Sequence, residues 1–201
     1  MAAPTKSADF AGYELNFTSA VPKLALTTTL VVPKVKCGAA KTSLNVGVET
    51  YPASGGVAGV LLAVQCRHHK AHYLPTAFTA NGAVTPGFAA HAGDKLVLSI
   101  KANSRVMFMS LIDKRSPKSD ARIYGPGDAS GYGDAQIGEF RASKAVPNFR
   151  TLTFTSSMLG GKPFGSDSPT GYDMTNPSTM AVQIATSAWT SHGTAFRTTY
   201  K

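Results

Sequence analysis

Two acids and two amides are the residues best placed for chemistry in this sequence. Glu139 lies in the segment QIGEF, which precedes the strand-like segment FRTLTFT, and Glu49 lies near the end of SLNVGVETY. Gln65 and Gln136 supply side-chain amides near these acids in the sequence. A carboxylate that a sheet holds rigidly is a candidate for acid–base chemistry. The elements that would position these four residues therefore decide what they can do.

Alternation of apolar and polar residues predicts short strands along most of the chain. In SLNVGVETY the apolar residues Leu44, Val46 and Val48 alternate with others, which places Glu49 on the polar face. The predicted strands are Tyr13–Thr18, Leu24–Val32, Ser43–Tyr51, Val57–Val64, His72–Ala80, Lys95–Ala102, Arg105–Asp113, Phe149–Thr155, Ser157–Leu159, Thr179–Ala188 and Thr194–Tyr200.

The segments between these strands predict a single β domain. Residues 1–9 are expected to form a flexible tail, and the polar stretches Ser116–Gly133 and Pro163–Ser178 are expected to be loops. About a dozen short strands without a convincing helix are typical of an all-β fold. We therefore expect an antiparallel two-sheet β-sandwich over residues 10–201.

Composition and charge narrow the possible partners. Of the 201 residues, 43% are hydrophobic and 15% are charged, which is typical of a folded domain, and no segment reaches the roughly 20 apolar residues of a membrane helix. The net charge is +9, but the basic residues spread from Lys6 to Lys201 without a dense run or interleaved aromatic residues. This pattern argues against specific nucleic-acid binding and favours a solvated basic surface, attracted to acidic cell-wall polymers or other polyanions.

The two cysteines indicate the compartment. Cys37 and Cys66 each close a strand-like run, LVVPKVKC and GVLLAVQC, so they are plausible disulfide partners in an oxidising environment. The alternative is a pair of buried free thiols in a cytosolic protein. The N-terminal segment MAAPTKSADF lacks the apolar core of a signal peptide. We expect a secreted protein whose leader is absent from this sequence.

Other motifs do not support metal or cofactor chemistry. His68, His69 and His72 form the segment HHKAH, but no second His or Cys cluster completes a zinc site, so a histidine-rich hairpin edge is favoured. The glycine-rich segment YGPGDASGYG lacks the Lys-Ser/Thr pair and the helix of a phosphate loop, and no G-x-S-x-G elbow occurs. We expect no metal and no organic cofactor.

The order of several segments resembles the glutamic peptidases (eqolisins), from about Phe10 to Tyr200. The segments that carry the resemblance are TTTLVVP at Thr27–Pro33, NVGVET at Asn45–Thr50, HAGDKLVLSI at His91–Ile100, QIGEF at Gln136–Phe140 and FRTLTFT at Phe149–Thr155. This resemblance implies a β-sandwich of the concanavalin A-like jelly-roll kind. It also implies an acid endopeptidase, in which a glutamate acts as general base on water and a glutamine helps to stabilise the oxyanion.

Position by position, the resemblance places the catalytic glutamate on Glu139. The family's Leu-Gln-Ala-Gly-Val segment lies over LLAVQC, so Leu62 stands where the glutamine would be. Gln65 is the candidate amide, although three residues along a strand place it on the opposite face from Leu62 unless a bulge intervenes. Asn45 stands for the family's tryptophan and Glu49 for its aspartate. The resemblance implies that Asn45, Glu49 and Leu62 contact the substrate.

The sequence leaves three functions open. The first is a monomeric peptidase acting on a polypeptide, which requires the Gln65 amide within about 3 to 4 Å of Glu139, directly or through one water. The second is a non-catalytic member of the family that binds a glycan or a polyanionic surface through its concave sheet. The third is a structural or surface-coat protein with the same sandwich.

Overall fold

The structure is almost entirely β-strand. The computed structural model describes residues 3–85, 88–115 and 120–201. Within them lie two short 3-10 helices, η1 (Phe164–Asp167) and η2 (Ser191–Gly193). The strands are β1 (Thr5–Ser7), β2 (Phe10–Val21), β3 (Lys23–Val31), β4 (Thr42–Thr50), β5 (Ala58–Arg67), β6 (Lys70–Thr79), β7 (Gly82–Val84), β8 (Lys95–Asn103), β9 (Val106–Asp113), β10 (Asp120–Pro126), β11 (Tyr132–Arg141), β12 (Thr151–Leu159), β13 (Lys162–Pro163), β14 (Thr170–Thr175), β15 (Val182–Thr186) and β16 (Phe196–Tyr200).

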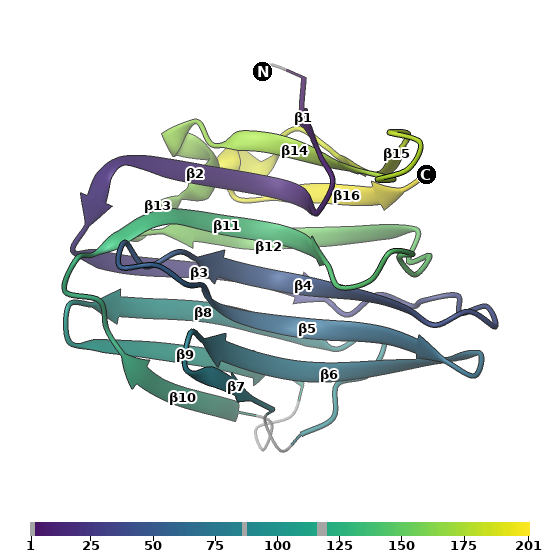
Figure 1. Ribbon diagram of the computed structural model, residues 1–201, viewed down its shortest axis with the longest axis horizontal. Coiled ribbons are helices and arrows are strands. Elements are labelled where there is room, and N and C mark those ends of the chain that lie inside the picture. Colours follow the sequence, from purple (N-terminus) through teal and green to yellow (C-terminus); the bar gives the residue numbers. More distant parts are fainter. Residues whose placement is uncertain (1–2, 86–87, 116–119) are drawn as a thin grey trace.

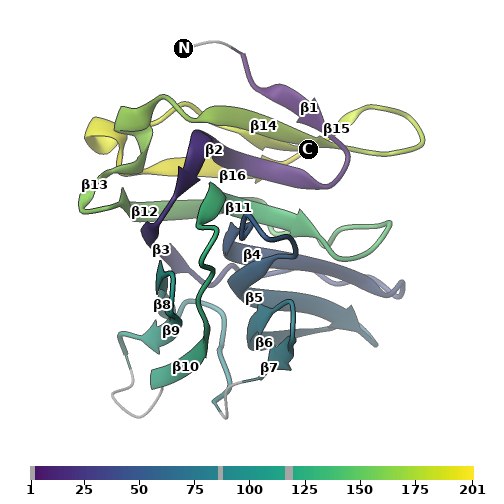
Figure 2. The ribbon, with the colours of Figure 1, turned by 60° about the vertical axis from the view of Figure 1, so that its left-hand side comes forward.

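The strands form two packed layers, as the sequence predicts. Their hydrogen-bonded order is β10-β9-β8-β3-β12-β16-β15-β14-β2-β11-β4-β5-β6-β7, with β1 on β14 and β13 on β12. The order is continuous, so the layers are joined through β15 and β14 at one side of the molecule. Beyond that side β4 and β5 pack over β3, β8 and β9 (Figure 2). The predicted antiparallel β-sandwich is confirmed, and among the described strands only the pair of β1 and β14 is parallel.

Period-two alternation fills the space between the layers with apolar side chains. On β4 the inward residues Leu44, Val46 and Val48 are almost completely buried, and on β5 Val60 and Leu62 face the same interior. The residues between them face outward from the layer, so the two faces of β4 and β5 differ in chemistry. This alternation decides which candidate residues can meet a ligand.

Three segments that the sequence places in loops or in a tail contain strands. Part of the predicted loop Ser116–Gly133 forms β10 and the start of β11, although residues 116–119 lie outside the described residues. The predicted loop Pro163–Ser178 contains η1 and β14. In the predicted tail, β1 pairs with β14, and residues 1 and 2 lie outside the described part. These segments are short and polar, and they become strands only because they pair with strands from distant parts of the chain.

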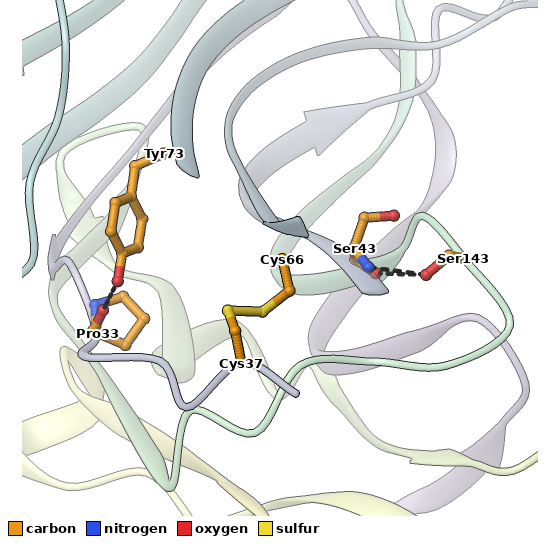
Figure 3. The surroundings of a disulfide bond; sticks show 6 residues. All are labelled: Pro33, Cys37, Ser43, Cys66, Tyr73 and Ser143. Atoms are coloured by element: carbon orange, nitrogen blue, oxygen red, sulfur yellow. Dashed lines mark hydrogen bonds between the residues drawn. A yellow bond between two sulfur atoms is a disulfide. The ribbon is translucent and has the colours of Figure 1, made fainter. Parts of the chain in front are cut away.

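A disulfide links Cys37 to Cys66, as expected, with the two Cα atoms 5.4 Å apart. It ties the chain that follows β3 to the end of β5 (Figure 3). Two further contacts hold the same region. The hydroxyl of Tyr73 donates to the carbonyl of Pro33 at 2.7 Å, and the backbone N–H of Ser43 donates to the Ser143 hydroxyl at 2.8 Å.

Candidate functional site

A groove of about 420 Å³ lies on the outward face of β2, β11 and β4. These three strands run side by side in Figure 1. The groove is lined by Ser7, Asp9, Phe10, Glu14, Asn45, Glu49, Tyr51, Gln136, Phe140, Arg141 and Tyr172. We call it the outer groove. It combines acids, one amide, aromatic rings and one guanidinium group.

The register of the strands places one amide between two acids. Gln136 on β11 is the direct partner of Glu14 on β2 and of Glu49 on β4. Side chains of directly opposed antiparallel residues lie on the same face, about 5 Å apart at Cβ. The Nε2 group of Gln136 donates to Glu14 Oε1 at 2.8 Å and makes a longer contact of 3.4 Å with Asp134 Oδ2. Glu14, Gln136 and Glu49 therefore form a row across the groove.

Burial changes the acidity of this row. Glu49 is only 7% exposed, and burial, followed by the negative charge of Asp134, raises the pKa of Glu49 from 4.5 to about 8. Burial also raises the pKa of Asp134 to about 6, although the backbone N–H of Tyr51 donates to Asp134 Oδ1 and favours the ionised form. The two carboxyl groups thus differ in acidity, which is the usual way for neighbouring acids to take different roles.

Aromatic rings and a buried guanidinium form the other end of the groove. The ring of Phe10 lies 5.0 Å from that of Phe140 and 5.7 Å from that of Tyr172, measured between centroids. The Arg141 guanidinium donates to the carbonyls of Ala8, Lys144 and Thr175 and to the side chain of Gln183. These bonds fasten the N-terminal segment to β11 and β14. The N-terminal segment is therefore a wall of the groove.

Two solved structures resemble this architecture over most of the chain. A scytalido-glutamic peptidase bound to a peptide-based transition-state analogue matches with a TM-score of 0.70 at 13% identity, over 98% of this chain and 100% of the other. The aspergilloglutamic peptidase of Aspergillus niger matches with a TM-score of 0.62 at 13% identity, over 80% of this chain and 99% of the other. This chain has the fold of the glutamic peptidases. No protein-family model and no curated protein sequence matches it.

Within this glutamic-peptidase fold, Glu139 does not reach the outer groove. It follows Ile137 by two residues on β11, so its side chain enters the space between the layers, where it is 0% exposed. The hydroxyl of Thr198 on β16 donates to one carboxyl oxygen, and the other oxygen is buried without a hydrogen-bond partner. Burial raises the pKa of Glu139 to about 8, although the bond from Thr198 favours the ionised form.

The expected pair of Glu139 and Gln65 is not formed. Gln65 pairs with Ser43 and faces outward, away from the interior that holds Glu139. It lines a separate pocket of about 170 Å³ beside Cys66 and Arg67, and its side-chain oxygen is buried without a partner. The required distance of a few Å is excluded because the two side chains lie on opposite faces of one layer.

The expected substrate contacts divide between the two faces. Asn45 and Glu49 line the outer groove. Leu62 faces the interior and is completely buried, so it cannot contact a substrate in the groove; Leu61 takes the outward face beside Phe10 and Phe140. The inward position of Leu62 follows from its alternation with Leu61 along β5.

Sequence reasoning missed Glu14, Asp134 and Arg141. Alternation along Phe10–Val21 directs the side chain of Glu14 to the other face of the strand from that of Tyr13. Only the pairing of β2 with β11 brings Glu14 next to Gln136. Asp134 follows a register shift between Tyr132 and Asp134 that the sequence does not reveal.

Within residues 3–85, 88–115 and 120–201, no group of three or more His, Cys, Asp or Glu side chains has the arrangement of a metal site. Among the same residues, no helix has the length and apolar character that crossing a membrane requires.

Proposed function

We propose that this protein hydrolyses peptide bonds in the outer groove, with Glu49 as the general base and Gln136 as the oxyanion donor. The observation that carries the proposal is the direct pairing of Glu49 with Gln136 on the groove face. A glutamate and a glutamine are thereby brought together on the fold of peptidases. The glutamate, Glu49, lies on β4, which is the neighbour of the strand β11 that carries Glu139, the base assigned by the sequence resemblance.

The chemistry uses groups that line the groove. The Glu49 carboxylate takes a proton from water, and the resulting hydroxide attacks the carbonyl carbon of the peptide. Negative charge then develops on the carbonyl oxygen, where the Gln136 amide donates a hydrogen bond. The 3.4 Å contact of this amide with Asp134 is long, so that hydrogen can be redirected at little cost. Protonated Glu49 returns its proton to the leaving amine, which breaks the C–N bond.

The acidity of Glu49 sets the pH range of the reaction. With its pKa near 8, Glu49 is a stronger base than an ordinary carboxylate, but only a fraction is ionised at neutral pH. The rate rises with pH until Glu49 is ionised. The proposed optimum is therefore neutral to weakly alkaline, in place of the acid range that the sequence resemblance implies.

The test is a pH–rate profile for cleavage of an unfolded protein substrate. We expect kcat/KM to rise about tenfold per pH unit and to level off near the pKa of Glu49. The variant Gln136→Leu is expected to keep this pH dependence with a rate about a hundredfold lower, because it loses the oxyanion donor but keeps the base. A rate that falls from acid to neutral pH would contradict the assignment of Glu49.

Secretion is part of the same proposal. The disulfide of Cys37 and Cys66 suits an oxidising compartment, where such bonds persist. The basic surface, with a net charge of +9, would hold the protein near acidic polymers outside the cell. Detection of the oxidised protein in the culture medium of its source would support export, and an exclusively intracellular, reduced protein would oppose it.

A further inference from the structure

The outer groove carries carboxyl groups without a matching cation. Glu14 and Glu49 line it, and Asp134 lies next to them. Among the described residues, no salt bridge reaches any of these three acids. The chain has 20 Lys and Arg residues against 11 Asp and Glu residues, so cations are abundant elsewhere. The groove therefore has more acidic than basic side chains, although the chain as a whole has more basic than acidic ones.

The charge of Arg141 is committed to the opposite end of the groove. Its guanidinium donates four hydrogen bonds to carbonyl and amide oxygens and lies 3.8 Å from Asp9. Those bonds hold the wall of the groove in place. Arg141 therefore does not neutralise the row formed by Glu14, Gln136 and Glu49.

Glu49 faces the groove and is not neutralised by a described cation. Its side chain lines the groove and is only 7% exposed, and no salt bridge from a described residue reaches it. A cationic ligand in the groove would therefore meet acids that the protein itself leaves without a positive charge beside them.

The aromatic rings of the groove limit which side chains of a ligand can fit against it. Tyr172 stands beside Glu14, and its ring lies 5.7 Å from that of Phe10 between centroids. Burial, and then the hydrogen bond with Glu14, raises the pKa of the Tyr172 phenol. A long side chain with an apolar stem and a cationic head can lie along such rings while its head reaches a carboxylate. Lysine and arginine are the peptide residues with this construction.

We propose that the outer groove selects peptides that place a lysine or arginine side chain against Tyr172 and Phe10, with its cationic head on Glu14. The inference rests on the proposed function, because it identifies the class of substrate for the same groove. It leaves Glu49 on the far side of Gln136, free to act on water.

The test measures binding, so that it does not depend on cleavage. Three blocked peptides that differ at one position, which is arginine, citrulline or leucine, are titrated into the wild-type protein. Citrulline keeps the shape of arginine but has no charge. We expect the arginine peptide to bind about tenfold more tightly than the citrulline peptide, as one charge-assisted hydrogen bond predicts.

The variant Glu14→Gln is expected to reduce this preference to about twofold or less, because it removes the charge that the cation contacts. Asp167→Asn is the matched control, since Asp167 is exposed and lies outside the groove, and it should leave the preference unchanged. Equal binding of the three peptides by the wild-type protein would overturn the inference. So would an equal loss of affinity for all three in Glu14→Gln, which would indicate a purely structural role.

The outcome is separable from that of the proposed function. If the arginine preference is found but no peptide is cleaved, cation recognition stands and peptide hydrolysis fails. If peptides are cleaved without regard to charge, hydrolysis stands and the inference about substrate class fails.

Discussion

Glu49 on β4 and Gln136 on β11 are direct cross-strand partners on the face of the outer groove. Glu139 lies three residues further along β11 and points the opposite way, into the interior. The strand that supplies the groove with its amide therefore also supplies the interior with a buried acid. These two acids should respond differently to pH and to mutation.

Glu139 should make the protein less stable as pH rises. Its pKa is about 8 when folded and near 4.5 when unfolded, so the folded state holds a proton that the unfolded state releases between these values. The stabilisation is fully present below about pH 4.5, declines as pH rises to about 8, and then stays constant, with a total change on the order of 5 kcal/mol. Asp134 and Glu49 contribute in the same direction.

The substitution Glu139→Gln isolates this effect, because glutamine does not titrate. We expect the free energy of unfolding of the variant to exceed that of the wild type increasingly between about pH 5 and about pH 8, measured by urea denaturation. Asp167→Asn removes an exposed acid and serves as control. A difference between Glu139→Gln and the wild type that does not change with pH would contradict the raised pKa.

Thr198 should stabilise the buried acid through its hydroxyl group. Thr198→Val keeps the shape of the side chain but removes the hydroxyl that donates to Glu139, whose other carboxyl oxygen already has no partner. We expect a loss of about 1 to 3 kcal/mol in the free energy of unfolding. Thr198→Ser retains the hydroxyl and should lose much less. Equal stabilities of the valine and serine variants would show that the hydrogen bond contributes little.

The disulfide should contribute substantially to stability. Cys37 and Cys66 are 29 residues apart in sequence, and a cross-link of this length restricts the unfolded chain by about 3 to 4 kcal/mol. We expect a double Cys→Ala variant to melt about 10 °C lower in a calorimeter. Wild-type protein melted under reducing conditions should match the variant. An unchanged melting temperature in both would contradict the structural role of the cross-link.

Arg141 should hold the N-terminal wall of the groove. In Arg141→Lys the single ammonium group cannot reproduce the four hydrogen bonds of the guanidinium. We therefore expect the free energy of unfolding to fall by about 2 kcal/mol. Amide hydrogen exchange should become faster in β1. Arg197→Lys, at an exposed position, provides the control. Unchanged exchange in β1 of Arg141→Lys would show that the wall does not depend on this residue.

The sequence predicted most of the strands because their alternation is local. Segments such as Ser43–Tyr51 and Lys95–Ala102 carry their period of two in the sequence itself, and they appear as β4 and β8. The strands β10 and β14 were missed because their polar segments become strands only through pairing with β9 and β2. Such pairing is a long-range property.

The site was harder to predict than the fold. Alternation alone indicated that Glu139 shares a face with the apolar Ile137, and this signal pointed to the interior. The positional resemblance to a family instead places Glu139 in the active site. The row of Glu14, Gln136 and Glu49 depends on the register of three strands from distant parts of the chain. No local pattern in the sequence sets this register.

The most direct test of the account compares Glu49→Gln with Glu139→Gln in cleavage of one unfolded protein substrate, at a pH near 7 where circular dichroism shows both variants folded. We predict that Glu49→Gln lowers kcat/KM by about a hundredfold or more, because it removes the general base. Glu139→Gln should retain nearly the wild-type rate, because its side chain does not reach the groove. Loss of activity in folded Glu139→Gln, with activity kept in Glu49→Gln, would contradict the account and return the catalytic role to Glu139.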